Sequence, residues 1–311
     1  MQTQSSFNAH GKLLLTAEYL VLDGAAALAL PCRYGQRMHV AKTSKTGRHV
    51  VCKSLDAQGQ EWFSGSFDIE ENTILSTTND GVASRFQSIL TYLFTRKPNA
   101  FPANTQIEFE HQIDFSRDWG LGTSSTLIYN MATWANIDPY GLTEHAFGGS
   151  GYDIACAGAN GPLLYRRNSA LPRFVEVNFN PSFKEDIYFV YLGQKQNSRE
   201  GIKNYRALDN ATKKPHAIAE IEELNENILS AKTLKEFEES IREHESIISN
   251  IIRMPKVQEL HFNDLDGVAK SLGAWGGDFV MLTYQGGHDV LKEYCKAKGF
   301  EVVIPYQQMI L

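Results

Sequence analysis

The segment of residues 118–135 carries residue types that could bind a chain of phosphates. Its loop reads, in order, Gly120, Leu121, Gly122, Thr123, Ser124 and Ser125. Glycine lets the backbone come close to an anion, and the first turn of a helix presents unpaired N–H groups at the positive end of its dipole. A hydroxyl residue there can cap the helix, bind a phosphate oxygen or ligate magnesium. The segment predicts a polyphosphate loop, with an ordinary helix cap as the alternative.

A carboxylate that could act as a general base follows at Asp153. Three glycines, Gly148, Gly149 and Gly151, converge on it at the start of a helix rich in small residues. A general base removes a proton from the attacking group, and a nearby lysine can balance part of its charge. Helix N-capping is the other role that an aspartate has at such a position.

Lys12 and Glu18 are charged residues inside an otherwise apolar segment, residues 11–24. Charges in such surroundings favour a functional role, since Lys and Glu are seldom buried without a reason. The alternative is a lysine whose aliphatic stem covers apolar surface and a glutamate at a turn.

The elements that position these residues are indicated by periodicity. After the glycine loop, apolar side chains recur at the spacing of one helix face, at Leu127, Ile128, Met131, Trp134 and Ala135. A second helix is predicted over residues 81–94. Residues 7–40 favour strands joined by tight turns, residues 41–72 exposed antiparallel hairpins, and residues 107–110 a strand. Residues 138–141 are typical of a turn, and residues 163–165 and 174–179 of strands.

The second half of the sequence begins at a predicted boundary near Pro181. A buried strand is expected over residues 187–192, then a polar loop at 193–200 that opens a helix. Residues 216–253 predict two amphipathic helices separated near 230–233, with their charges on a solvated outer face. A second glycine-rich loop covers residues 269–278, followed by a strand at 279–284, a helix at 290–298 and a strand at 301–305.

Composition limits the class of protein. The 311 residues suffice for one large or two ordinary domains, and 42% hydrophobic with 21% charged residues describes a folded chain. A net charge of −6 without basic runs argues against nucleic-acid partners. The four cysteines form no C-x-x-C pair, so we expect reduced thiols and a cytoplasmic protein. No signal peptide is apparent, and the most apolar early run, residues 13–31, is too polar to span a membrane.

Three glycine-bearing segments in this order resemble the GHMP kinases, the superfamily of galactokinase, homoserine kinase, mevalonate kinase and phosphomevalonate kinase. Residues 11–24 resemble the first motif, residues 120–126 the Gly-Leu-Gly-Ser-Ser phosphate loop, and residues 270–278 the third motif. Residues 151–155 spell GYDIA, the name of a bacterial subgroup described as mevalonate-kinase-like. The resemblance covers nearly the whole chain.

The resemblance implies an α+β fold with two domains. Residues 1–181 would form an ATP-binding domain of the ribosomal-S5-domain-2-like type, and residues 182–311 a ferredoxin-like C-terminal domain. ATP and Mg²⁺ would be the cofactors, and the partner a small anionic acceptor. Nucleic acid and membrane are not expected as partners, and the exposed helices at 216–253 are candidates for a homodimer contact.

The resemblance also implies roles for single residues. Asp153 would accept the proton of the acceptor hydroxyl and Lys12 would pair with it. The loop from Gly120 to Ser125 would wrap the ATP phosphates, with Ser125 reaching magnesium. The remaining implied contacts are acceptor binding by Glu18, Ser198 and Gly273, and closure over the phosphates by Gly276 and Gly277.

The sequence departs from the family pattern at several positions. Residues 116–119 replace the usual Pro-x-x-x, Ala17 and Tyr19 replace the Gly and His of Gly-Glu-His, and Leu272 and Trp275 stand where small residues are usual. The helix that normally carries a magnesium-binding Glu is missing from the short stretch between Ser125 and Asp153. Glu144 is the nearest candidate for that ligand, with a helix-surface role as the alternative.

The reaction implied is transfer of the ATP γ-phosphoryl group to an alcohol or phosphate, with mevalonate as the first acceptor and isoprenoid biosynthesis as the setting. Phosphomevalonate kinase is the second interpretation. A diphosphomevalonate decarboxylase of the same superfamily and a non-catalytic sensor of nucleotide and ligand on the same fold are two rival interpretations. The presence of Lys12, Asp153 and the Ser124–Ser125 pair argues against the sensor, because a binding module needs no base facing a cation.

Overall fold

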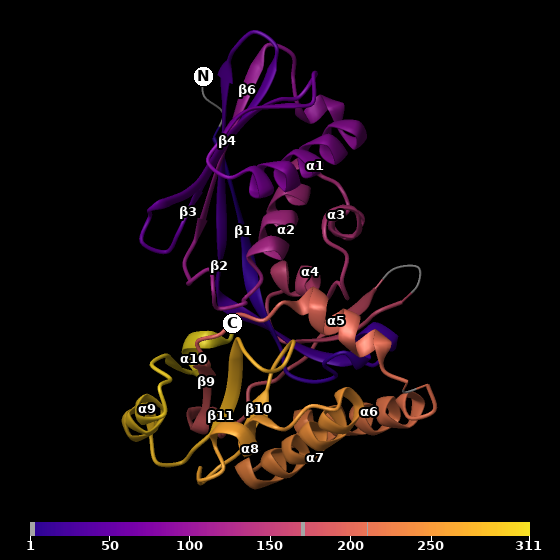
Figure 1. Cartoon of the computed structure of the whole chain (residues 1–311), viewed down its shortest axis with the longest axis vertical. Coiled ribbons are helices and arrows are strands. Elements are labelled where there is room, and N and C mark those ends of the chain that lie inside the picture. The colour runs from indigo at the N-terminus through magenta and orange to yellow at the C-terminus, as the bar shows by residue number, and fades with distance from the viewer. Residues whose placement is uncertain (1–3, 169–171, 210) are drawn as a thin grey trace. The chain divides into compact units, whose positions relative to one another are not determined.

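The computed structural model describes residues 4–168, 172–209 and 211–311. The chain forms two compact units (Figure 1). The first unit contains the described residues up to Gly11 together with Tyr34–Arg117 and Leu121–Gly158. The second contains Lys12–Arg33, Asp118–Gly120 and Ala159–Leu311. These units do not follow the predicted boundary after residue 181, and the two consecutive domains stay a prediction.

The first unit is built on a mixed sheet whose strands follow the order β5-β4-β3-β6-β2, with β1 also paired to β2. β3 pairs with β4 antiparallel and with β6 parallel. Alternate residues of β6, such as Ile107 and Phe109, are buried, as expected of a strand with one covered face. The strands are β1 (Ser5–Leu14), β2 (Ala27–Ser44), β3 (Arg48–Leu55), β4 (Glu61–Asp68), β5 (Thr73–Thr77) and β6 (Thr105–Ile113).

Helices complete the core of the first unit. The core combines Val50, Phe67 and Phe109 from the sheet with Leu90 of α1 and Met131 of α2. Asn79 caps α1 by accepting a hydrogen bond from the backbone N–H of Val82. The helices are α1 (Asp80–Arg96), α2 (Thr123–Ala135), α3 (Pro139–Ala146) and α4 (Tyr152–Ala157), with the 3₁₀ turn η2 (Pro98–Ala100).

The second unit contains a four-stranded antiparallel sheet of order β10-β11-β9-β12. All five residues of β11 are buried, and the first four of them are apolar, as expected of a strand covered on both faces. The first residues of β2 also belong to this unit, where they pair with β7 and β7 pairs with β8. The strands are β7 (Leu163–Arg166), β8 (Arg173–Glu176), β9 (Ile187–Tyr191), β10 (Ala269–Ser271), β11 (Phe279–Thr283) and β12 (Val303–Pro305).

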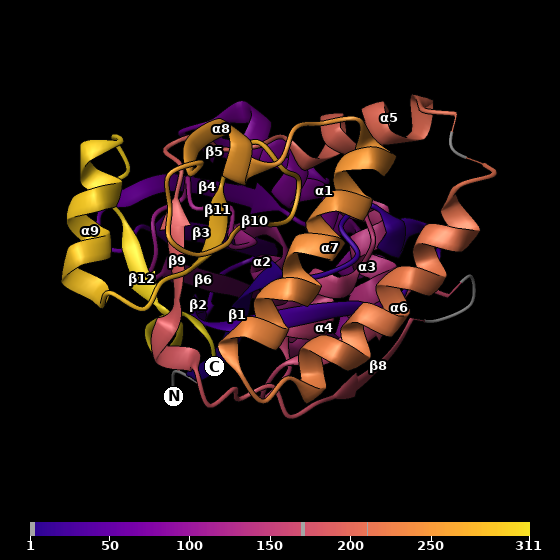
Figure 2. The ribbon, with the colours of Figure 1, turned by 90° about the horizontal axis from the view of Figure 1, so that it is seen from below.

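Two long helices, α6 and α7, pack side by side in the second unit (Figure 2). A capping box begins α7: Thr233 accepts from the N–H of Glu236, whose carboxylate accepts from the N–H of Thr233. The helices are α5 (Ser198–Ala207), α6 (Lys214–Ser230), α7 (Leu234–Ile252), α8 (Val257–His261), α9 (His288–Ala297) and α10 (Tyr306–Met309), with the 3₁₀ turns η1 (Leu20–Asp23) and η3 (Lys184–Asp186).

Most elements predicted from periodicity are confirmed, including both helices of residues 216–253 and the break between them. Four expectations are wrong in part. Residues 138–141 begin α3 instead of forming a turn, because the Asp138 side chain caps the helix. The hairpin of β3 and β4 is buried on one face. His244 and Glu245 of α7 lie inside instead of on a solvated face. Residues 269–271 form a buried strand rather than loop.

Two expectations about the whole chain can be compared with the structure. All four cysteines are buried free thiols, as the absence of paired spacing predicts. Among the helices of residues 4–168, 172–209 and 211–311, none combines the length and apolar character needed to cross a bilayer.

Candidate functional site

The predicted phosphate loop leads into α2 in the first unit. Gly122 is the N-cap residue with φ of 95°, a left-handed conformation that suits glycine. It has no side chain with which to cap the helix. The Ser125 hydroxyl instead donates 2.8 Å to the Gly122 carbonyl oxygen, and Ser124 is exposed. The first turn of α2 therefore begins without a side-chain cap at its N-cap residue, which favours the anion-binding interpretation over the capping one.

Gly11 of motif one packs against the same loop within the first unit. A Cβ atom added to Gly11 would lie 3.0 Å from the carbonyl oxygens of both Leu121 and Tyr34. Only a residue without a side chain allows this approach comfortably, so the glycine lets β1 pack against the backbone of the predicted phosphate loop.

Asp153 lies in the first turn of α4, also in the first unit. Gly151 is the N-cap residue, and it and Gly149 have φ of 87° and 116°. Asp153 Oδ1 accepts a hydrogen bond of 3.1 Å from the N–H of its neighbour Ile154. Because Gly151 occupies the N-cap position, the role of Asp153 is not that of an N-cap residue, and its half-buried carboxylate can act in chemistry.

The predicted magnesium ligands are placed on different helices of the first unit. Ser125 is buried on α2, whereas Glu144 is exposed on α3. Within the described part of the chain, no group of three or more His, Cys, Asp and Glu side chains could hold a metal ion. A hydroxyl and a carboxylate, completed by phosphate and water, are oxygen donors of the kind that a nucleotide-borne Mg²⁺ takes. The assignments of Ser125 and Glu144 stay predictions.

Lys12 belongs to the second unit, where its Nζ donates 2.7 Å to the carbonyl oxygen of Gly120. Asp278 faces the same glycine, because a Cβ atom added to Gly120 would lie 2.6 Å from Asp278 Oδ1. Burial raises the pKa of Asp278, against the opposing effects of Lys12 and of the Gln196 N–H, which donates 3.2 Å to Oδ1. The sequence interpretation assigned no role to Asp278, although its carboxylate lies in the third glycine segment.

The third glycine loop turns through residues with left-handed backbone. Gly273, Trp275, Gly276 and Asp278 have φ of 60°, 57°, 77° and 54°. Leu272 and Trp275, the two large residues that depart from the family pattern, are both 2% exposed. Both large side chains are therefore buried instead of being exposed on the loop. Strained backbone at non-glycine residues is often found in functional segments. Trp275 and Asp278 are two such residues in this loop.

Ser198 is the first residue of α5 in the second unit. It is exposed, and the preceding Asn197 caps the helix by accepting 3.2 Å from the N–H of Arg199. Its predicted contact with the acceptor stays a prediction.

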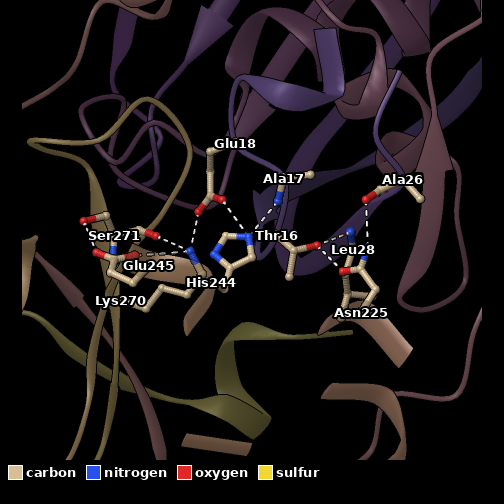
Figure 3. A network of polar contacts seen from close by, with 10 residues as sticks. All are labelled: Thr16, Ala17, Glu18, Ala26, Leu28, Asn225, His244, Glu245, Lys270 and Ser271. Atoms are coloured by element: carbon tan, nitrogen blue, oxygen red, sulfur yellow. Dashed lines mark hydrogen bonds and ion pairs between the residues drawn. The ribbon is translucent and has the colours of Figure 1, made fainter. Parts of the chain in front are cut away.

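Glu18 is fully buried in the second unit. Its Oε1 accepts from Lys270 Nζ at 2.5 Å, and its Oε2 lies 3.5 Å from His244 Nε2 (Figure 3). Burial raises the pKa of Glu18 to about 7, against the opposing charge of Lys270. This placement favours a role in positioning over contact with an acceptor, and the latter stays a prediction.

Sequence reasoning missed Lys270 and His244 as partners of Glu18. Two signals were present: a lysine beside apolar residues in a short strand, and polar residues at 244 and 245 within the apolar stripe of α7 that contains Ile241 and Ile248. Asp153 and Lys12 belong to different units, and their predicted pairing stays a prediction.

Comparisons with known proteins rest on structure alone. No protein-family model matches the sequence, and no curated protein sequence matches it. Mevalonate kinase from Methanococcus jannaschii matches with a TM-score of 0.70 and 15% identity, over 97% of each chain. Phosphomevalonate kinase from Streptococcus pneumoniae, in complex with phosphomevalonate and AMPPNP, matches with a TM-score of 0.69 and 16% identity, over 96% of this chain and 98% of the other.

Galactokinase from Lactococcus lactis, complexed with galactose, matches with a TM-score of 0.66 and 12% identity, over 95% of this chain and 89% of the other. The three proteins act on different molecules while sharing one architecture with this chain. The α+β fold predicted for the chain is confirmed.

Proposed function

We propose, from the premise that this chain has the fold of the GHMP kinases, that it transfers the γ-phosphoryl group of ATP to a small anionic acceptor. The observation that carries the proposal lies in the first unit. There a glycine N-cap leaves the first turn of α2 open to phosphate, and Asp153 presents a carboxylate from the first turn of α4. Phosphoryl transfer requires positioning and charge neutralisation more than covalent chemistry, and these groups supply both.

In this proposal the backbone from Gly120 to Gly122, with Thr123, Ser124 and Ser125, holds the ATP phosphates. The N–H groups at the start of α2 donate to phosphate oxygens, and the dipole of the helix favours their negative charge. Mg²⁺, when bound with ATP, neutralises phosphate charge, and Ser125 and Glu144 are the residues proposed to reach it. Gly276 and Gly277 of the third motif approach the phosphates through their backbone.

Asp153 is the proposed base. It accepts the proton of the acceptor hydroxyl as that oxygen attacks the γ-phosphorus, and Lys12 supplies a positive charge that stabilises the arrangement. Lys12 already donates to the Gly120 carbonyl, so its ammonium group is held at the phosphate loop within its own unit. Ser198 and Gly273 are proposed to contact the acceptor.

Mevalonate is the first proposed acceptor and phosphomevalonate the second. The structures of similar fold include kinases for both, and the identity of 15–16% leaves the choice to experiment. The cytoplasmic location, a homodimer and a place in isoprenoid biosynthesis are proposed together with this activity.

The test is ADP release by the purified protein with magnesium-ATP and a panel of acceptors: mevalonate, phosphomevalonate, diphosphomevalonate, homoserine and galactose. Asp153→Asn should lower turnover about 10²- to 10⁴-fold because the base is lost. Asp80→Asn is the matched control, since Asp80 also lies in the first turn of a helix of the first unit but is exposed.

Near-normal turnover in Asp153→Asn would show that Asp153 is not the base. Carbon dioxide release from diphosphomevalonate would identify a decarboxylase. Tight ATP binding with no turnover on any acceptor of the panel would favour the sensor instead.

A further inference from the structure

The motif-one turn has a backbone that must be held in place by its surroundings. Ala17 and Tyr19, on either side of Glu18, have φ of 61° and 63°. A sparsely populated backbone conformation of this kind costs a non-glycine residue roughly 1–3 kcal/mol. Such conformations persist only when neighbouring contacts determine them strongly. The contacts that do so here come from α6, α7 and β10 of the same unit.

A buried ion pair holds the centre of the turn. Lys270 of β10 is 0% exposed, and its Nζ donates 2.5 Å to Glu18 Oε1 and 2.9 Å to the carbonyl oxygen of Ser271. The same Nζ lies 3.5 Å from Oε2 of Glu245, another buried carboxylate (Figure 3). Removing one member of a buried pair leaves the other charge uncompensated, which makes each partner dependent on the other.

His244 of α7 holds the backbone of the turn. The Ala17 N–H donates 2.9 Å to His244 Nε2, so this nitrogen is an acceptor and the ring proton resides on Nδ1. Burial, together with Lys270, lowers the pKa of His244 well below its ordinary value, which agrees with a neutral ring. On the other side of the turn, the Thr16 hydroxyl donates a hydrogen bond of 2.6 Å to Oδ1 of Asn225 in α6.

The same network reaches the third glycine motif. Glu245 Oε1 accepts 3.0 Å from the Ser271 N–H and 2.7 Å from its hydroxyl. Tyr19 of motif one donates through its hydroxyl 2.6 Å to the carbonyl oxygen of Ala274, inside the glycine loop. Motif one and motif three are therefore joined on two sides, by the Glu18–Lys270 pair and by the Tyr19–Ala274 bond.

We propose that Lys270 is a positioning residue, which acts through its ion pair with Glu18 to hold the motif-one turn and the glycine loop of residues 272–278 in one arrangement. The loop is then preset for nucleotide phosphates, and only this last step rests on the proposed kinase function. Lys270 and Glu18 are buried together, and both side chains are 0% exposed. Their effect is to remove the alternative conformations that a loop of three glycines would otherwise adopt.

The experiment compares amide hydrogen exchange of residues 272–278 and AMPPNP affinity in wild type, Lys270→Met and the double variant Glu18→Gln/Lys270→Met. The double variant removes both charges, so it avoids an unpaired buried carboxylate at Glu18. Lys235→Met, at a lysine of α7 whose side chain is 85% exposed, is the matched control. We expect at least tenfold faster exchange of the loop and at least tenfold weaker AMPPNP binding in both Lys270 variants, and neither change in the control.

Tyr19→Phe provides a milder variant that removes only one hydroxyl and its bond to Ala274. It should speed exchange at residues 274–276 while leaving the unfolding midpoint nearly unchanged. If neither Lys270 variant folds, Glu18→Gln, which keeps the shape of the side chain and removes the charge that Lys270 faces, decides the proposal through the same exchange measurement.

A purely structural role would lower the unfolding midpoint and leave exchange of the folded loop unchanged, and that result would overturn the proposal. If wild type itself does not bind AMPPNP, the proposed kinase function fails. The exchange measurement still decides whether Lys270 positions the loop, so the two failures are distinguishable.

Discussion

The buried carboxyl group of Glu18 should make the stability of this protein depend on pH in an unusual direction. Burial raises its pKa from 4.5 to about 7, although Lys270 opposes the shift. The groups that face it are Lys270 of β10, and His244 and Glu245 of α7. The folded state holds the Glu18 proton more tightly than the unfolded state does. The contribution of this protonation to the free energy of unfolding is therefore fully present below pH 4.5, and it is lost as pH rises to about 7.

The magnitude follows from the gap between the two pKa values. A shift from 4.5 to about 7 corresponds to roughly 3 kcal/mol at about 1.36 kcal/mol per pKa unit. No discount for solvent screening applies, because Glu18 is 0% exposed. Glu18→Gln keeps the shape of the side chain and removes the titration. The difference in unfolding free energy between wild type and this variant should therefore change by about 3 kcal/mol between pH 4.5 and 7.5.

The assay is urea unfolding at pH intervals from 4.5 to 8, with wild type, Glu18→Gln and Glu71→Gln measured together. Glu71 is exposed, so its variant controls for the loss of one negative charge. If the wild-type and Glu18→Gln curves stay parallel over this range, Glu18 does not change protonation there. An increase of wild-type stability relative to Glu18→Gln as pH rises would refute the sign of the argument.

Two further predictions concern local structure. Gly120→Ala should destabilise the protein by more than the roughly 1–2 kcal/mol of a left-handed alanine, because its Cβ would lie 2.6 Å from Asp278 Oδ1. Gly59 has φ of 77° and nothing within 4 Å of an added Cβ, so Gly59→Ala measures the backbone cost alone when both variants are unfolded thermally. Equal losses of stability in the two variants would contradict the Asp278 contact. Thr233→Ala should cost about 1 kcal/mol by breaking the capping box of α7. Ser246→Ala, in the interior of the same helix, should cost less in urea unfolding, and a reversed order would count against the cap.

Local sequence signals predicted much of the fold. The helices of residues 81–94 and 216–253 were predicted because apolar side chains repeat every three to four residues, and the structure has α1, α6 and α7 there, each with buried apolar residues on one side. The glycine loop that leads into a helix was predicted from neighbouring residues, and Gly122 adopts the left-handed conformation that only a few residue types tolerate. These features depend on interactions within one or two turns of chain.

Burial of charge could not be predicted in the same way. Glu18 and Lys270 are separated by 252 positions, and only the path of the chain through the second unit brings them together. Lys12 and Asp278 meet at Gly120 for the same reason. The amphipathic pattern of α7 predicted a solvated polar face, yet His244 and Glu245 belong to the buried stripe because motif one and β10 pack against it.

The sequence alone thus determined the helices, the strands and the glycine loops, since propensity, capping and periodicity act between residues close along the chain. The tertiary structure decided which carboxylates are buried, which lysine neutralises them and which backbone strain they support. The energy of a charge depends on its distance from opposite charge and water, and both are fixed only when remote segments pack together.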